Sequence, residues 1–142
     1  MSAKTASHMR WHKDKRRDDG ILRHPADAQA WKSFDASYAD FVKDPRNVRL
    51  GFCSDGFTPY SNTNSTYSIW PVFFVPYNLP PWICMKKPYT FLNMIILDKT
   101  APGTDIDVYL QPLIDELKTL WDGVNTYDAF KVEYFNLRAA LL

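Results

Sequence analysis

Two aspartates stand where apolar runs of the sequence end, and carboxylates are oxygen ligands that Mg²⁺ and Mn²⁺ prefer. Asp55 follows the apolar run in "NVRLGFCSDGFTPY" (47–60), and Asp98 follows "YTFLNMIIL" (89–97). An Asp at the end of a strand presents its side chain at the rim of a sheet, where a hard cation can reach it, and Gly56 lets a ligand come close to the backbone. The alternative is an Asp-Gly turn that joins two strands, and the local pattern alone favours that turn.

Other side chains have weaker claims to a metal site. Asp115 and Glu116 can supply carboxylates from a helix, but both also suit its solvated face. His8 and His12 are four residues apart, a spacing that can place two imidazoles on one helix face for zinc. Because no convincing third and fourth ligands accompany them, we interpret these histidines as surface or packing residues.

Basic residues define a second kind of candidate site, one that contacts DNA phosphates without reading sequence. The candidates are Arg10, Lys13, Arg16, Arg17, Arg46 and Arg49, with Trp11 and Tyr60 as candidate stacking partners. Arg46 and Arg49 lead directly into the run that ends at Asp55, so they can hold a DNA backbone near it. Each group has a structural alternative: "KDKRRDD" (13–19) suits a solvated turn, and Arg49 can pair with a neighbouring acid.

Composition limits the class of protein. The chain has 142 residues, 46% of them hydrophobic, which is enough for one core and a single compact domain or part of one. Its formal net charge is +1, from 17 basic and 16 acidic residues, so any DNA-binding signal must be local. The two cysteines, Cys53 and Cys84, define no disulfide framework and suit inert packing. With no secretory signal, and with "SIWPVFFVPY" too short to span a bilayer, we expect a soluble intracellular protein without membrane partners.

The elements that must position these residues follow from apolar periodicity and its breakers. Pro25 and the apolar face that follows predict a short amphipathic helix in 24–41, ending before Pro45. Three apolar runs bounded by turn residues predict strands at 48–54, 67–77 and 89–97. The prolines inside the second run predict an edge position or a bulge there.

The second half of the chain predicts a long helix and a last strand. Apolar residues recur at helical spacing from Ile106 to Trp121, with Gly123 at the left-handed C-terminal position and Pro112 close to the first turn or at a kink. The run from Phe130 alternates and then becomes almost wholly apolar, which predicts a final strand. We therefore divide the chain into an N-terminal basic and helical segment, residues 1–46, and a core, residues 47–142.

This order of elements predicts an α/β fold with an RNase H-like sheet. Three strands can form a meander, the long helix can cross over, and the last strand can return parallel to the first. A carboxylate at the end of the first strand and another on the fourth would then lie side by side, close enough to hold a divalent metal.

Several blocks of the sequence also resemble one known family. These blocks are "HMRWH", "RHPADAQAWKSFD", "DPRNVRLGFCSDGFTPY", "YSIWPVFFVPYNLPPWICMK", "APGTDIDVYLQPLIDELKTLW" and "TYDAF…FNLRAALL". Together, from about His8 to Leu142, they resemble the catalytic region of plant CACTA-type (En/Spm-like) DNA transposases. The resemblance implies an RNase H-like DDE/D core that holds Mg²⁺ or Mn²⁺ at transposon ends in the nucleus, with Asp55 as its first acid.

The same resemblance implies that the core is incomplete in this sequence, because the family pattern continues after "RAALL" into a segment with the next acid. Two-metal strand transfer needs several positioned carboxylates, so Asp55 cannot perform it alone. The first hypothesis is a transposase fragment, inactive by itself, that contacts DNA and other transposase subunits. The alternative is a non-catalytic DNA- or transposase-binding module derived from a transposon. A third is a decayed remnant whose exposed last strand drives aggregation.

Overall fold

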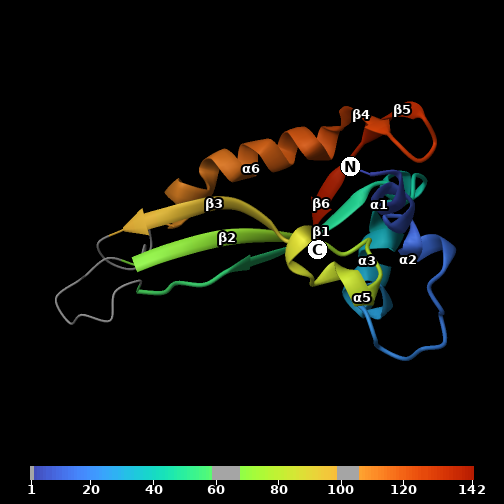
Figure 1. Cartoon of the computed structure of the whole chain (residues 1–142), viewed down its shortest axis with the longest axis horizontal. Coiled ribbons are helices and arrows are strands. Elements are labelled where there is room, and N and C mark those ends of the chain that lie inside the picture. The colour runs from blue at the N-terminus through green and yellow to red at the C-terminus, as the bar shows by residue number, and fades with distance from the viewer. Residues whose placement is uncertain (1, 59–67, 99–105) are drawn as a thin grey trace.

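The computed structural model of the protein describes residues 2–58, 68–98 and 106–142. Its helices are α1 (Ala3–His8), α2 (Trp11–Asp14), α3 (Gln29–Ser37), α4 (Ala39–Val42), α5 (Pro81–Cys84) and α6 (Ile106–Asp122), with short 3-10 turns at Pro25–Asp27 and Lys87–Tyr89. Its strands are β1 (Val48–Ser54), β2 (Ser68–Pro76), β3 (Phe91–Asp98), β4 (Val124–Asp128), β5 (Glu133–Leu137) and β6 (Ala139–Leu141). Figure 1 shows the long strands reaching away from a cluster of short helices, with α6 lying along the sheet.

The main sheet is mixed and has the strand order β3-β2-β1-β6. β1 pairs with β2 and β2 with β3 in antiparallel fashion, which confirms the predicted meander. β6 pairs with β1 in parallel, with Val48 opposite Ala139 and Leu50 opposite Leu141. A parallel return needs a crossover connection, and α6 lies in that connection as predicted. The described residues therefore form an α/β fold.

The two prolines of β2 sit where the sheet does not need their missing N–H groups. β2 is an inner strand, so the predicted edge position is wrong. The register between β2 and β3 shifts between Val72 and Phe73, next to Pro71, but the residue that the pairing skips is Asn93 of β3 and not a proline of β2. Pro71 faces the stretch after Ser54, where the ladder between β1 and β2 is interrupted. Pro76 lies beyond Phe74, the last β2 residue that pairs with β3. Proline removes one ladder donor, and both positions tolerate that loss.

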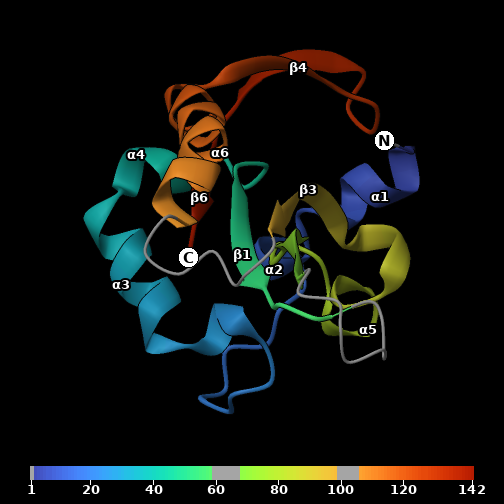
Figure 2. The same cartoon turned by 90° about the vertical axis from the view of Figure 1, so that its left-hand side faces the viewer.

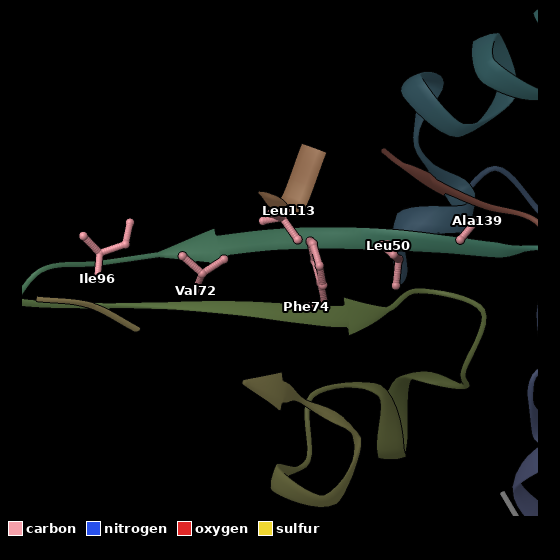
Figure 3. Packing of buried hydrophobic residues seen from close by; sticks show 6 residues of the cluster. All are labelled: Leu50, Val72, Phe74, Ile96, Leu113 and Ala139. Atoms are coloured by element: carbon pink, nitrogen blue, oxygen red, sulfur yellow. The ribbon is translucent and has the colours of Figure 1, made fainter. Parts of the chain in front are cut away.

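One face of the sheet packs against α6 to form the main core. The buried members of this core are Leu50, Val72, Phe74, Ile96, Leu113 and Ala139. Figure 3 shows Leu113 extending from α6 toward the strands that carry Phe74 and Leu50. α6 supplies apolar residues at helical spacing to this face and ends at Asp122. The next residue, Gly123, has a φ of +113°, which is the left-handed conformation that the sequence predicted there. Pro112 lies inside the helix instead of at its first turn.

The N-terminal segment packs against the other end of the sheet. Met9, which follows α1, is buried together with Val75, Leu79 and Cys84, so residues before 46 share a core with β2 and α5. Figure 2 shows the helices of this segment beside β1. The single helix predicted in 24–41 is divided into a 3-10 turn, α3 and α4, because Ala28 and Tyr38 leave the helical conformation. The domain boundary at residue 46 stays a prediction.

The last part of the chain differs from the prediction of one continuous strand. β4 and β5 form a separate antiparallel pair, and only Ala139–Leu141 joins the main sheet. The alternation at Phe130 and Val132 belongs to the turn between β4 and β5, where Asp128 Oδ1 accepts hydrogen bonds from the backbone N–H groups of Phe130 and Lys131 at 2.9 and 3.2 Å. This local capping makes a turn where periodicity alone predicts a strand. None of the helices in the described ranges is both long and apolar enough to cross a bilayer.

Candidate functional site

Asp55 lies in an extended stretch at the end of β1, not in a turn. The antiparallel register that pairs Ser54 with Val72 resumes at Phe57, which exchanges backbone hydrogen bonds with Ile69 at 3.0 and 2.9 Å. In that register Asp55 stands opposite Pro71, which has no N–H to donate to it. The Asp-Gly turn favoured by the local pattern is therefore wrong. Asp55 is exposed, and no described residue forms an ion pair or hydrogen bond with its carboxylate.

Gly56 is required by packing and not by a turn. A side chain at this position would overlap the ring of Trp70, the residue that faces Gly56 across the strands. Trp70 in turn packs against the main core beneath α6. The Trp70 ring therefore packs directly against the backbone next to Asp55. This contact fixes the position from which the Asp55 side chain extends.

Replacement of Gly56 by alanine is expected to lower the free energy of unfolding by about 1–3 kcal/mol, because the new methyl group must displace the Trp70 ring. Urea denaturation followed by circular dichroism measures this loss. In the double variant with Trp70→Val the overlap disappears, so the combined loss should be smaller than the sum of the two single losses. Strictly additive losses would contradict this account of Gly56.

The other candidate carboxylates lie apart from Asp55. Asp98 ends β3 opposite Ser68, two strands away from β1, which places its backbone about 10 Å from Asp55 across the sheet and about 10 Å further along it. The structure describes the backbone of Asp98 but not its side chain. Asp115 pairs with Lys118 at 3.1 Å on α6, and Glu116 is exposed on the same helix. α6 covers the face of the sheet to which Trp70 contributes, and the alternation of side chains along a strand places Asp55 on the other face. The described residues contain no group of three or more His, Cys, Asp or Glu side chains that could hold a metal ion.

β6, the parallel strand beside β1, runs toward the end of the sheet at which Asp55 lies. β6 pairs with the first half of β1, and the N–H of Leu142 donates to the carbonyl of Leu50 at 3.0 Å. The sequence predicted this parallel neighbour, and the structure confirms it. Residues 51–54 of β1, and Asp55 after them, lie further along the same direction, beyond the residues of β1 that pair with β6.

Arg49 is a buried structural residue. It is 1% exposed, its Nη2 lies 2.5 Å from Asp35 Oδ1, and its guanidinium lies over the Trp31 ring at 4.3 Å. Burial lowers the pKa of Arg49, and Asp35 acts against that shift. The alternative from the sequence, in which Arg49 pairs with a neighbouring acid, is the arrangement that the structure has, and its guanidinium is not presented to a phosphate.

Arg46 is also engaged within the protein. Its guanidinium contacts Asp44 at 2.7 Å, Asp128 at 3.3 Å and Glu133 at 2.8 Å, and it lies 3.8 Å from the centre of the Phe135 ring. The hydrogen bond to Asp44 is the largest of the effects that raise the pKa of Arg46. Arg46 thereby joins the start of β1 to the β4–β5 hairpin.

The basic run of the N-terminal segment contains both paired and unpaired cations. Arg16 contacts Asp27 at 2.8 Å and Asp18 at 3.5 Å. Lys13 and Arg17 are exposed, and neither forms an ion pair with a described residue. Of the basic candidates for DNA contact, these two remain available to a phosphate. Tyr60, a candidate stacking partner, lies outside the described residues.

His12 is a packing residue. Its ring lies 5.3 Å from that of Trp31, and the side chain is 9% exposed. Burial, followed by the charge of Arg49, lowers the pKa of His12 to about 4. The zinc alternative gains no support, since the described residues place no third ligand beside His8 and His12.

Comparison with known protein families decides the origin of the chain. The family model described as Transposase family tnp2 matches residues 19–142. The chain belongs to this transposase family. No curated protein and no solved structure matches it.

The tnp2 match spans the part of the chain that holds Asp55. It begins at Asp19, the last residue of the basic run, and includes α3, every strand of the main sheet and α6. The tnp2-family region therefore includes the Asp35–Arg49 pair, the extended stretch at Asp55 and the parallel strand β6.

Several residues that the structure makes important have no role predicted from the sequence. The partners of Arg46, Asp128 and Glu133, lie 82 and 87 residues away along the chain, and no local signal connects them to it. Trp82 lies in "NLPPWIC", where an aromatic among apolar residues suggests a core position, yet it is 59% exposed. The Pro-Pro pair before Trp82 was the available signal for a distinct position of this residue. Two prolines restrict the backbone that carries the Trp82 side chain.

Proposed function

We propose that this chain supplies part of the catalytic region of a DNA transposase, with Asp55 as one ligand of a Mg²⁺ or Mn²⁺ site. The observation that carries the proposal is the exposed Asp55 in an extended stretch at the end of β1, on the side toward which the parallel strand β6 runs. Membership of the tnp2 transposase family supports it.

An RNase H-like core is part of this proposal. The antiparallel meander β3-β2-β1, the crossover through α6 and the parallel β6 beside β1 support it. The described residues by themselves do not complete a metal site, so we propose that further carboxylates come from outside them. We also propose that the chain is of the plant CACTA (En/Spm) type, acts on transposon ends in the nucleus, and works with other transposase subunits.

A titration with Mn²⁺ followed by NMR tests the role of Asp55. Mn²⁺ broadens the signals of nearby nuclei, so the backbone amides of residues 54–56 should lose intensity first in the wild-type chain. Asp55→Asn should abolish this local broadening, because the carboxylate ligand is lost. Asp115→Asn on α6 is the matched control and should leave it unchanged. Broadening that centres elsewhere, or that survives in Asp55→Asn, would overturn the assignment.

The second candidate function is a non-catalytic DNA- or transposase-binding module. The unpaired Lys13 and Arg17, together with the lack of a carboxylate cluster among the described residues, favour it. The Mn²⁺ titration separates the two candidates, because a catalytic fragment that is inactive by itself still keeps Asp55 as a metal ligand, whereas the module does not need one. Broadening at residues 54–56 that Asp55→Asn abolishes supports the fragment, while DNA binding by the folded chain without that broadening supports the module.

A further inference from the structure

A hollow of about 360 Å³ lies between α2, the segment that follows α2, and α5. Trp11, Pro81 and Trp82 supply its apolar lining, while Lys15, Arg17 and Arg23 are among its basic residues. An apolar floor beside a basic rim suits a ligand that has both a flat ring and a negative charge.

The charges of the hollow are only partly balanced. Arg23 forms a two-pronged pair with Asp19 at 2.8 and 3.0 Å, and Arg16 is held by Asp27. Lys15 and Arg17 are exposed and form no ion pair with a described residue. Two positive charges therefore remain available to an anion at this site.

The exposed aromatic residue of the hollow is Trp82, which lies between buried residues of the core. Trp82 is 59% exposed, and its ring lies 5.8 Å from that of Trp11 at an interplanar angle of 81°. The residues around it are anchored: Leu79 is fully buried and Cys84 is 2% exposed in the core with Met9. Pro80 and Pro81 restrict the backbone at the start of α5. Trp82 is thus a preorganised aromatic surface open to solvent.

We propose that this hollow binds an unpaired nucleotide of a DNA strand, with the base stacked on Trp82 and a neighbouring phosphate bound by Lys15 and Arg17. Stacking on an exposed aromatic ring requires a base that is not already stacked inside a duplex, so the combination favours single-stranded DNA. Phosphates alone would need the cations but not Trp82. The inference rests on the proposed function in one respect, namely that DNA is the partner.

Fluorescence anisotropy with the full chain tests this inference, using a labelled single strand, the same strand with abasic sites, and the matching duplex. Trp82→Ala should weaken binding of the single strand by about 5- to 150-fold, the range found when one stacked base is lost. Trp82→Phe should restore most of the affinity. The wild type should bind the abasic strand more weakly than the normal strand, and Trp82→Ala should not weaken that binding further.

The phosphate contacts have their own readout. The slope of log K against log salt is negative for the single strand, and replacing both Lys15 and Arg17 by Gln should reduce its magnitude by about 1.4. Lys118→Gln, an exposed cation on α6, is the matched control and should leave the slope unchanged. Circular dichroism melting checks that the variants are folded.

The inference fails if Trp82→Ala binds the normal single strand as tightly as the wild type does, if it weakens duplex and single strand equally, or if the folded chain binds no single strand. The proposed role of Asp55 is tested separately by Mn²⁺ broadening, which Trp82→Ala should leave unchanged. Broadening at Asp55 without single-strand binding would therefore overturn the nucleotide site alone. Single-strand binding without that broadening would overturn the role of Asp55 alone.

Discussion

Replacing Asp35 by alanine is expected to lower the free energy of unfolding by about 3–5 kcal/mol, the cost of leaving a buried charge without its partner. Arg49 is 1% exposed, and Asp35 is the acid that contacts it, at 2.5 Å. Asp35 also accepts a hydrogen bond from Trp31 Nε1 at 3.1 Å, so the substitution removes two interactions at once. Urea denaturation at pH 7 measures the loss.

A double variant separates the charge effect from simple loss of packing. Arg49→Met removes the buried cation, so the Asp35→Ala/Arg49→Met chain should be more stable than Asp35→Ala alone. Asp40→Ala on α4 is the matched control: it also removes an acid from an ion pair, with Lys43, but both side chains are exposed, and the denaturation midpoint should not move. If the double variant were no more stable than Asp35→Ala, the buried charge would not be the source of the loss.

This experiment also bears on the prediction that Arg49 contacts DNA. A residue that holds α3 against β1 affects DNA binding only through folding. Arg49→Met should therefore retain the DNA affinity of the wild type at temperatures where both chains are folded. The unpaired cations of the N-terminal segment, Lys13, Lys15 and Arg17, should instead account for the salt dependence of phosphate binding.

Lowering the pH from 7 to about 4.5 is expected to destabilise the protein through His12. Burial lowers the pKa of His12 from its ordinary 6.5 to about 4, so the unfolded chain binds a proton between these values and the folded chain does not. Stability is therefore fully present above 6.5 and is lost as the pH falls toward 4. The gap between the two pKa values corresponds to about 3 kcal/mol at most.

His12→Leu should remove most of this pH dependence, because leucine fills the site beside Trp31 without titrating. Denaturation midpoints at pH 7.5, 6.5, 5.5 and 4.5 measure it, and the range stays above the region where carboxylates dominate. His24, whose pKa burial also lowers, should leave a smaller residual slope. His8→Leu is the matched control, and its denaturation midpoints should depend on pH as those of the wild type do. Parallel curves for the wild type and His12→Leu would contradict the assignment.

The local signals of the sequence were sufficient for most of the main sheet and for α6. The apolar runs at 48–54 and 89–97 became β1 and β3 because their boundaries are set by proline, glycine and polar residues next to them in the chain. α6 and its end before Gly123 follow from helical spacing and one left-handed residue, which are also local. The order of these elements was enough to predict the meander and the parallel return of β6 beside β1.

The environment of each candidate site residue, in contrast, depends on groups far away in the sequence. Whether Asp55 turns or stays extended is decided across the sheet, where Ile69 pairs with Phe57 and Pro71 offers no N–H. Arg49 is a core residue because α3 brings Asp35 and Trp31 to it. Charge and periodicity in the sequence identify which residues can do chemistry, but burial and pairing arise only when distant segments pack, and these decide which of them face a ligand.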